Sequence, residues 1–251
     1  MKKTLLRALL LACSFPLFIN GIIIESDNLE DVFTYADKDS IVAFDIDDTI
    51  AELPLGLAQW IEYRFFELQK MGFDKKEAYE IVLPMFFTIN NFVKLVPIGN
   101  SPNIVYELQK KDIPVIGLTN RSIPMIERTI DQLESIDIDF SLNSTFQNNM
   151  KLSATHMGAF CQDIVFAGFN DKGKMLFLLF KKTGFYPKKI IFVDDRLEQI
   201  EAVEKKAIEH NIEFIGIRFS LQDNKKINCD IKNLEKNFYN FKVVLGMEPI
   251  A

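Results

Sequence analysis

Cysteine and histidine are scarce in this chain, which limits the kinds of site that it can build. Only three of its 251 residues are Cys and two are His. Cys13, Cys161 and Cys229 match no zinc-binding spacing, and His156 and His210 lie far apart and near no motif. We therefore expect no zinc centre and assign neither histidine a role. A disulfide between Cys161 and Cys229 stays open, beside the alternative of two separate buried thiols.

Long runs of positive charge, repeats and low-complexity segments are also missing. The formal net charge is −6, from 29 basic and 35 acidic residues. No basic stretch is interleaved with aromatic residues, so we expect no nucleic-acid partner. The charged fraction of 25% and the apolar fraction of 48% are ordinary for a soluble globular protein. The length suits one core domain with a small insert.

The amino terminus has the pattern of a targeting segment. Lys2, Lys3 and Arg7 form a positive start, and residues 8–19 are apolar apart from one Ser and one Pro. A charged start followed by about 7–15 apolar residues is typical of a secretory signal. We therefore interpret residues 1–21 as a signal peptide or membrane-targeting segment.

Three fates of this segment stay open. The string Leu10-Leu11-Ala12-Cys13 resembles a lipoprotein processing site, although an apolar stretch continues after it. A retained anchor is a second possibility, although a spanning helix needs about 20 apolar residues. We favour cleavage near Asn20-Gly21. The mature protein is then exported from a bacterial cell to the periplasm, envelope or medium, with no stable membrane span.

Five short apolar runs predict the strands of a parallel sheet. They are residues 41–44, 114–118, 164–167, 190–193 and 214–219. Helical patterns alternate with them; the first of these starts at Ser101-Pro102, with Ser101 expected as the N-cap. This alternation predicts an α/β fold, a Rossmann-like parallel sheet with helices on both faces. Residues 221–251 are expected to form a terminal helix or strand packed on the core.

A segment after the first strand interrupts the alternation. Residues 54–96 are too long for a single crossover and contain two helical stripes. Asp74 and Glu77 are spaced as a capping box for the second helix, and Pro84 is expected to kink or divide it. The pattern predicts a small helical cap inserted into a core made of residues 22–53 and 97–251. We expect Trp60, Phe86 and Phe87 to pack within this insert rather than line a substrate cavity.

Carboxylates gather at the ends of two predicted strands. Asp45 and Asp47 follow the first strand, and Asp194 and Asp195 follow the run at 190–193. Open α/β sheets bind ligands outside the carboxyl ends of their strands. Adjacent buried carboxylates repel one another unless a cation neutralises them, and an all-oxygen ligand set suits Mg²⁺. The pattern therefore predicts a magnesium or phosphate site.

Two further residues favour an anion at the same edge of the sheet. Thr119 ends a predicted strand with a hydroxyl, and Lys172 opens a helix, where its charge opposes the helix dipole. A lysine in that position is better explained if it faces an anion. Arg121 and Arg196 lie beside these motifs, but each is as well placed to pair with a carboxylate, so we leave both out of the site.

The four motifs, taken in order, resemble those of the haloacid dehalogenase superfamily of hydrolases. They are D-x-D-x-T at residues 45–49, a strand ending in Thr119, Lys172, and a strand ending in Asp194-Asp195. The resemblance covers about residues 40 to 220, and the superfamily places one type of cap where the helical insert lies. Among its members, the chain looks like exported bacterial acid phosphatases.

The resemblance implies a phosphoric monoester hydrolase. Asp45 would be the nucleophile that forms an aspartyl-phosphate intermediate. Asp47 would protonate the leaving alcohol and then act as base on the hydrolytic water. The substrate implied is a small phosphorylated metabolite, whose identity is left open together with the oligomeric state.

The resemblance also implies the cofactor and the charges around it. Mg²⁺ would be held by Asp45, the backbone carbonyl of Asp47 and Asp194, with Asp195 as a direct or water-mediated supporter. Thr119 and Lys172 would neutralise the oxygens of the transferring phosphoryl group. These residues are listed together as the expected site: Asp45, Asp47, Thr119, Lys172, Asp194 and Asp195.

Alternatives from other classes stay open. A receiver-type phosphoacceptor or phosphotransferase uses similar residues, but there the acidic pair comes first in the chain and the phosphorylated Asp later. A two-metal nuclease would leave Thr119 and Lys172 unexplained. An envelope or secreted binding protein that keeps the fold without catalysis is separated from an enzyme by an assay with p-nitrophenyl phosphate, with and without Mg²⁺.

Overall fold

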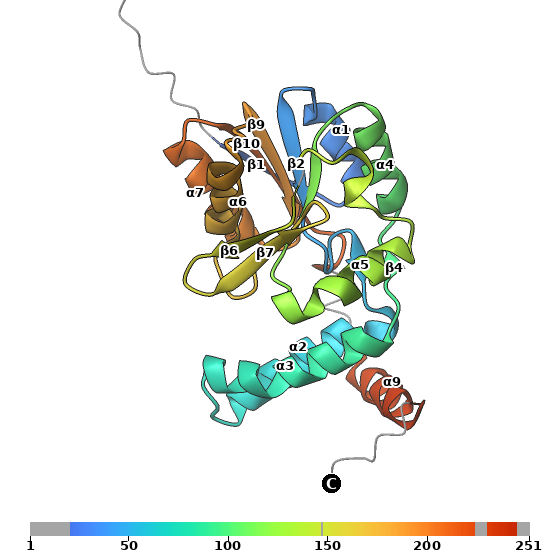
Figure 1. The fold of residues 1–251 in the computed structure, drawn as a ribbon. Helices are drawn as coiled ribbons and strands as arrows, with labels where there is room; N and C mark the ends of the chain where they lie inside the picture. Colours follow the sequence, from blue (N-terminus) through green and yellow to red (C-terminus); the bar gives the residue numbers. More distant parts are fainter. Residues whose placement is uncertain (1–20, 147, 224–229, 245–251) are drawn as a thin grey trace, which may run out of the picture.

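The structure, a computed structural model, describes residues 21–146, 148–223 and 230–244 (Figure 1). The expected export segment lies almost entirely outside these ranges, as does Cys229. Neither the processing of the leader nor the pairing of Cys161 with Cys229 is therefore tested. Within the described ranges, no helix combines the length and the apolar character that a membrane crossing needs.

A mostly parallel sheet of eight strands forms the centre of the molecule. Its order is β1-β10-β9-β2-β5-β8-β7-β6; the first six strands are parallel, and β7 and β6 are antiparallel to their neighbours. The strands are β1 (Ile22–Ser26), β2 (Ser40–Phe44), β5 (Val115–Thr119), β6 (Met150–Ser153), β7 (Met157–Cys161), β8 (Ile164–Phe166), β9 (Lys189–Asp194) and β10 (Glu213–Phe219). The five predicted strands are present as β2, β5, β8, β9 and β10, and the α/β fold is confirmed.

The side chains of the central strands contribute to two hydrophobic cores, one on each face of the sheet. In β2, Val42 and Phe44 belong to one core, and Ile41 and Ala43 belong to the other. Because a strand that is buried on both faces has no solvent side, all four positions are apolar. Both faces therefore have to be covered.

Helices cover the two faces of the sheet (Figure 1). α1 (Val32–Tyr35), α4 (Ser101–Lys110) and α5 (Ile126–Glu134) contribute to the core of Val42 and Phe44. α6 (Lys172–Thr183) and α7 (Leu197–Glu209) contribute to the opposite core. This arrangement agrees with the sequence prediction of helices on both faces.

The start of α4 differs from the expectation. Asn100 occupies the N-cap position, and Ser101 is the first helical residue. The Ser101 hydroxyl donates instead to the backbone oxygen of Ile50 at 2.6 Å. The side chain expected as a cap therefore ties α4 to the loop that follows β2.

Three strands at the margins of the sheet were not predicted. β1 is a half-exposed edge strand, and β6 and β7 form an antiparallel hairpin at the other edge. β6 has only one buried side chain, Leu152. β6 therefore lacks the continuous apolar run that identified the central strands. β1 begins with three Ile and β7 has three buried residues, so both were missed although apolar sequence was present.

Residues 54–96 contain two long helices that lie beside each other outside the sheet layers (Figure 1). α2 (Leu57–Lys70) and α3 (Lys75–Phe92) form this helical hairpin, and the strands β3 (Ala51–Glu52) and β4 (Val96–Pro97) pair at its base. The predicted capping box is present, with Asp74 and Glu77 each binding the other's backbone N–H. Pro84 does not divide α3, which continues on both sides of it as one helix.

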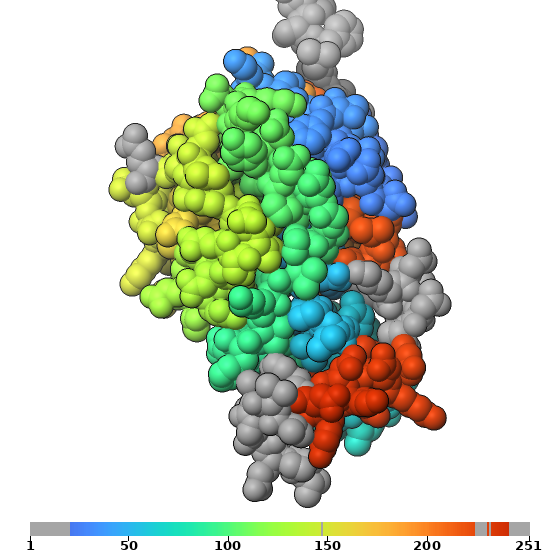
Figure 2. Space-filling view, turned by 90° about the vertical axis from the view of Figure 1, so that its right-hand side faces the viewer, coloured from blue at the N-terminus to red at the C-terminus, as the bar shows by residue number. Residues whose placement is uncertain are grey.

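The last part of the chain that the structure describes is a helix that packs on this hairpin. α9 (Ile231–Val244) contacts α2, and Figure 2 shows it in red against the cyan segment. Trp60 of α2 stacks on Phe238 with the ring centroids 3.5 Å apart. Trp60 was expected to pack within the insert, but its ring partner lies on α9. The terminal segment was expected to pack on the core, and Phe238 does pack against the core cluster of Val42 and Phe44.

The close approach of α6 and α7 depends on Gly173. A Cβ atom at this position would lie 2.2 Å from the backbone oxygen of Ala202. We expect Gly173→Ala to destabilise the fold by about 1–3 kcal/mol, because the two helices would have to separate. Thermal unfolding followed by circular dichroism measures this, with the exposed Lys174→Ala as control; an unchanged melting temperature in Gly173→Ala would contradict the packing argument.

Candidate active site

Two neighbouring strands bring the predicted carboxylates together. β2 and β9 are parallel, and Phe44 pairs with Val193. The Asp45 N–H donates to the Val193 oxygen at 2.9 Å, so the ladder continues one residue past β2. Asp45 and Asp194 therefore end adjacent strands at the same level of the sheet.

Asp45, Asp194 and Asp195 form a buried acidic cluster. One carboxylate oxygen from each residue lies within 4.8 Å of the others. The exposed fractions of the three residues are 6%, 0% and 6%. A group of three carboxylates so far from solvent requires positive charge close by.

Lys172 supplies positive charge at the centre of this cluster. Its Nζ lies 2.6 Å from Asp45 Oδ1 and 2.7 Å from Asp194 Oδ2. The first turn of α6 positions it, because Asp171 caps that helix by accepting a hydrogen bond from the Lys174 N–H at 2.7 Å. The lysine side chain is 2% exposed. The location of Lys172 at a helix start is thus explained by an ion pair with two strand ends.

The charges of the cluster shift one another's protonation. Burial raises the pKa of Asp45 well above its usual value, and the Lys172 charge opposes this only in part. Burial also raises the pKa of Asp194. Burial would lower the pKa of Lys172, but its pairing with Asp194 and Asp45 outweighs burial and raises that pKa. Lys172 is therefore positively charged, and Asp45 and Asp194 hold protons more readily than exposed carboxyl groups do.

Two backbone contacts fix the loops that carry the carboxylates. The Asp195 N–H donates to Oγ1 of the fully buried Thr49 at 3.1 Å. The Arg196 N–H donates to Asp194 Oδ1 at 2.8 Å, which leaves Asp194 Oδ2 for Lys172. Thr49, the threonine of the D-x-D-x-T string, thereby joins the loop after β2 to the loop after β9. It was not among the expected site residues, although its place in the motif marked it.

The Asp47 carboxylate lies apart from the acidic cluster. It forms a two-pronged pair with Arg121, with Nε to Oδ2 at 2.9 Å and Nη2 to Oδ1 at 2.7 Å. The cluster of carboxylates that could hold a metal ion does not include the Asp47 side chain, and the expected metal contact of its backbone carbonyl stays a prediction. Arg121, which the sequence analysis left out of the site, is part of its rim.

Thr119 ends the strand on the other side of β2. Phe44 pairs with Gly117, so Thr119 extends two residues past that level, beside the loop that carries Asp45. Its hydroxyl oxygen accepts the Arg121 N–H at 3.1 Å, and the side chain is buried. The structure therefore pairs Lys172 with Asp45 and Asp194 and brings Asp195 into the same cluster, with Thr119 and Asp47 at the margin.

The helical hairpin contacts the loops around the site in two places. Tyr79 of α3 packs edge-on against Phe169 in the loop that precedes Lys172, with centroids 5.8 Å apart. Near the other end of α3, the Asn90 Oδ1 accepts a hydrogen bond from Arg121 at 3.1 Å. Phe169 is 53% exposed, so aromatic surface remains available beside the site.

The acidic cluster fits a divalent cation. Its three carboxylates exceed the single charge of Lys172 by two, and every candidate ligand atom is an oxygen. Hard cations such as Mg²⁺ and Ca²⁺ prefer such a set, and Mg²⁺ takes few carboxylates together with water and phosphate oxygens. Asp45, Asp194 and Asp195 are the side chains that would hold the ion.

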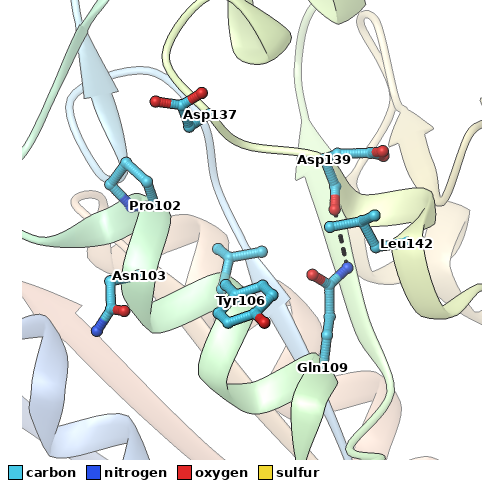
Figure 3. Close-up of a pocket in the computed structure, with 8 residues that line it drawn as sticks. Pro102, Asn103, Tyr106, Gln109, Asp137, Asp139 and Leu142 are labelled. Carbon is cyan, nitrogen blue, oxygen red and sulfur yellow. Dashed lines mark hydrogen bonds between the residues drawn. The ribbon is translucent and has the colours of Figure 1, made fainter.

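A separate cavity of about 240 Å³ lies elsewhere, along α4 (Figure 3). Its lining includes Tyr106, Gln109, Asp139 and Leu142. The Gln109 Nε2 donates to the backbone oxygen of Asp139 at 2.9 Å. None of the expected site residues lines this cavity, so it does not belong to the acidic cluster.

Comparison with known proteins relates the chain to several bacterial sequences. The family model described as "Protein of unknown function (DUF2608)" matches residues 25–251. A protein of Rickettsia bellii is 25% identical over 232 residues, which is 83% of this chain and 79% of that protein. A Chlamydia pneumoniae protein named "Putative outer membrane protein" is 25% identical over 222 residues, which is 86% of this chain and 83% of that protein.

Solved structures with a similar arrangement include a dehalogenase and an acid phosphatase. The dehalogenase aligns with a TM-score of 0.45 and 13% identity, over 72% of this chain and 84% of that one. The class C acid phosphatase from Bacillus anthracis aligns with a TM-score of 0.39 and 10% identity, over 88% of this chain and 84% of that one. Similarity at this level gives no activity, so the function has to be argued from the site.

The acidic cluster predicts stabilisation by divalent cations. A ligand that binds only the folded state at a hundredfold excess over its Kd stabilises by about 2.7 kcal/mol. We expect Mg²⁺ to raise the melting temperature of the chelator-treated protein, and Asp194→Asn to abolish the rise. Asp171→Asn, an exposed change near the cluster that keeps the helix cap, serves as control. An equal rise in Asp194→Asn would show that Mg²⁺ binds elsewhere.

The same site predicts a pH dependence of the metal effect. Because the pKa values of Asp45 and Asp194 are raised, protons compete with the cation at a higher pH than they would at exposed carboxylates. We expect the rise in melting temperature with Mg²⁺ to be largest at neutral to weakly alkaline pH and to shrink as the pH falls. Melting temperatures measured across this pH range, with and without Mg²⁺, check it. A constant rise would contradict the assignment of these ligands.

Proposed function

We propose that the chain, which belongs to the family described as "Protein of unknown function (DUF2608)", is a Mg²⁺-dependent phosphomonoester hydrolase. The observation that carries the proposal is the buried ion triplet of Asp45, Lys172 and Asp194 at the carboxyl ends of β2 and β9. Phosphoryl transfer needs a nucleophile, a positive charge and a metal site close together. Here a carboxylate, a buried lysine and a cluster of possible metal ligands lie within a few ångströms of one another. Phosphoryl transfer depends largely on positioning the reacting groups and on neutralising the charge of the phosphoryl oxygens.

Asp45 is the proposed nucleophile. Its carboxylate lies in the acidic cluster, where Oδ1 accepts a hydrogen bond from Lys172. In the proposed reaction an Asp45 oxygen bonds to phosphorus while the bond from phosphorus to the ester oxygen breaks. The product is an aspartyl-phosphate, which water then hydrolyses.

Lys172 and Thr119 are the proposed stabilisers of the transferring oxygens. Lys172 keeps its charge because both of its carboxylate partners favour the protonated amine. A fixed charge in a water-poor site stabilises the developing negative charge without having to reorient. Thr119 provides a hydroxyl at the neighbouring strand end.

A divalent cation bound by Asp45, Asp194, Asp195 and the Asp47 carbonyl would neutralise the repulsion between Asp45 and the phosphate dianion. Asp194 and Asp195 are suited to this binding because their loop is held by Thr49 and by the Arg196 N–H. The set of oxygen ligands therefore exists before any ion arrives.

Asp47 is the proposed acid and base. It follows the nucleophile by two residues, and its side chain is 33% exposed, unlike those of the cluster. A carboxylate at the solvent-facing rim can give a proton to the leaving alcohol and later take one from water. The location of the Asp47 carboxylate outside the acidic cluster is consistent with this role, because a general acid has to face the leaving group and not the metal.

The proposed substrate is a small phosphorylated metabolite, and the α2–α3 hairpin is the proposed cap. The hairpin contacts the loops on two sides of the site through Tyr79 and Asn90. We also propose that the protein is exported, which agrees with the charged and apolar start of the chain and with the name "Putative outer membrane protein" of the chlamydial relatives.

The proposal predicts that Asp45→Asn abolishes turnover, because the amide cannot attack phosphorus. We expect a fall of at least about 1000-fold in kcat for p-nitrophenyl phosphate and for any metabolite found by a phosphate-release screen. Phosphate release is measured with and without Mg²⁺. Asp48→Asn is the matched control, since it changes a carboxylate of the same loop that lies outside the acidic cluster and has a φ of 61° that Asn tolerates.

Two further results bear on the proposal. Acid quenching of the wild-type protein during turnover should trap phosphate covalently on the chain, and Asp45→Asn should trap none. Undiminished hydrolysis by Asp45→Asn would exclude Asp45 as the nucleophile. Absence of phosphate release by the wild-type protein from every ester tested would favour a binding protein that keeps the fold without catalysis.

A further inference from the structure

Arg121 is a buried cation with an unusually complete set of partners. Its side chain is 1% exposed, and its five N–H groups make five hydrogen bonds. Two go to the Asp47 carboxylate, and the others go to Asn90 Oδ1, Thr129 Oγ1 and Gln132 Oε1 at 3.1, 3.1 and 2.7 Å. The guanidinium plane is therefore fixed by groups from three separate parts of the chain.

Two of the three neutral partners, Asn90 and Gln132, are also anchored by contacts that do not involve Arg121. Asn90 Nδ2 donates to the Phe86 oxygen, and Gln132 Nε2 donates to the backbone oxygens of Asn90 and Val93. Asn90, Thr129 and Gln132 are all buried, with exposed fractions of 0–1%. They form a buried set of hydrogen-bond acceptors between α3 and α5, and these acceptors orient the plane of the Arg121 guanidinium.

Among the side-chain partners that Arg121 has within the described residues, Asp47 alone reaches solvent. Its side chain is 33% exposed, and the paired Arg121 side chain is 1% exposed. A carboxylate has about four lone-pair positions, and the fork occupies two of them. The remaining positions lie on the side away from the guanidinium.

We propose that Arg121 is a positioning residue that aims Asp47 at the leaving group and couples this aim to the α2–α3 hairpin through Asn90. The inference rests on the proposed hydrolase function. Asn90 lies near the carboxyl end of α3, and the base of the hairpin pairs with the loop after Asp47: β3 pairs with β4, and the Ile98 N–H donates to the Ile50 oxygen at 2.9 Å. A movement of α3 would therefore be transmitted to Asp47 by two routes. One is the backbone pairing at the base of the hairpin, and the other is the guanidinium of Arg121.

Esters with different leaving groups test the positioning role. A purely structural role of Arg121 would not change the ratio of their kcat/KM values. p-Nitrophenolate leaves without a proton, whereas an alkoxide needs one, so only alkyl esters depend strongly on general acid catalysis. We expect Arg121→Lys to lower kcat/KM for glycerol phosphate about 10- to 100-fold more than kcat/KM for p-nitrophenyl phosphate, with phenyl phosphate between them. Lysine keeps the charge but offers no planar fork to orient a carboxylate.

Arg128→Lys is the matched control. Arg128 is an arginine of α5 that donates to the backbone oxygens of Asn90 and Val93 at 2.9 Å each, at the same joint between α3 and α5. Both of these contacts are with α3 and the residue that follows it, and neither is with Asp47. We expect this variant to keep the wild-type ratio of the two kcat/KM values, even if the melting temperature falls.

Asn90→Ala tests the coupling and also serves if Arg121→Lys does not fold. It removes the hydrogen bond between the hairpin and Arg121 and leaves the Arg121–Asp47 pair in place. We expect a smaller shift of the ratio in the same direction. An unchanged ratio in Asn90→Ala beside a shifted ratio in Arg121→Lys would overturn the coupling.

Other outcomes separate this inference from the proposed function. A uniform loss across all three esters in Arg121→Lys, or faster hydrolysis of glycerol phosphate, would overturn the positioning role while leaving the phosphatase intact. A wild-type protein that releases phosphate from none of the esters would overturn the proposed function, and the inference would fall with it.

Discussion

The ion triplet of Lys172 with Asp45 and Asp194 is the interaction on which the arrangement of the site depends. It joins the ends of β2 and β9 to the first turn of α6, elements that lie far apart along the chain. Removing a buried ion from water costs several kcal/mol, and the loss is offset only when the opposite charges are close and well oriented. Each partner therefore constrains the other two, and a shift of α6 against the sheet would expose uncompensated charge.

This constraint explains why small residues and backbone contacts surround the triplet. Gly173, which follows Lys172, allows α6 to approach the backbone of α7. Thr49 and the Arg196 N–H hold the loops after β2 and β9 at their buried ends. The negative charge that remains after pairing with Lys172 cannot be dispersed by solvent, since all three carboxylates are buried. The same rigidity that keeps the charges paired thus preserves a site for a cation.

Much of this architecture follows from the sequence, because it depends on local patterns. Continuous apolar runs identified β2, β5, β8, β9 and β10, and a parallel sheet places their carboxyl ends at one edge. Asp45 and Asp194 could be associated because each ends such a run. β6 could not be found in this way, since Leu152 is its one buried side chain. β1, with three consecutive Ile, and β7, with three buried residues, carried apolar sequence that was not interpreted as strand. The start of α4 was misjudged because the Ser101 hydroxyl binds Ile50, a residue 51 positions earlier.

The position of Asp47 depends on a different kind of information. Its partner Arg121 is 74 positions away, and the residues that orient Arg121 lie on α3 and α5. No periodicity or spacing predicts which helix faces meet in this way, so the sequence could only leave Arg121 as a choice between a carboxylate and a substrate. Charges at strand ends are brought together by the sheet, whereas charges at the rim are brought together by helix packing. The first kind can be predicted from sequence patterns, and the second requires the fold.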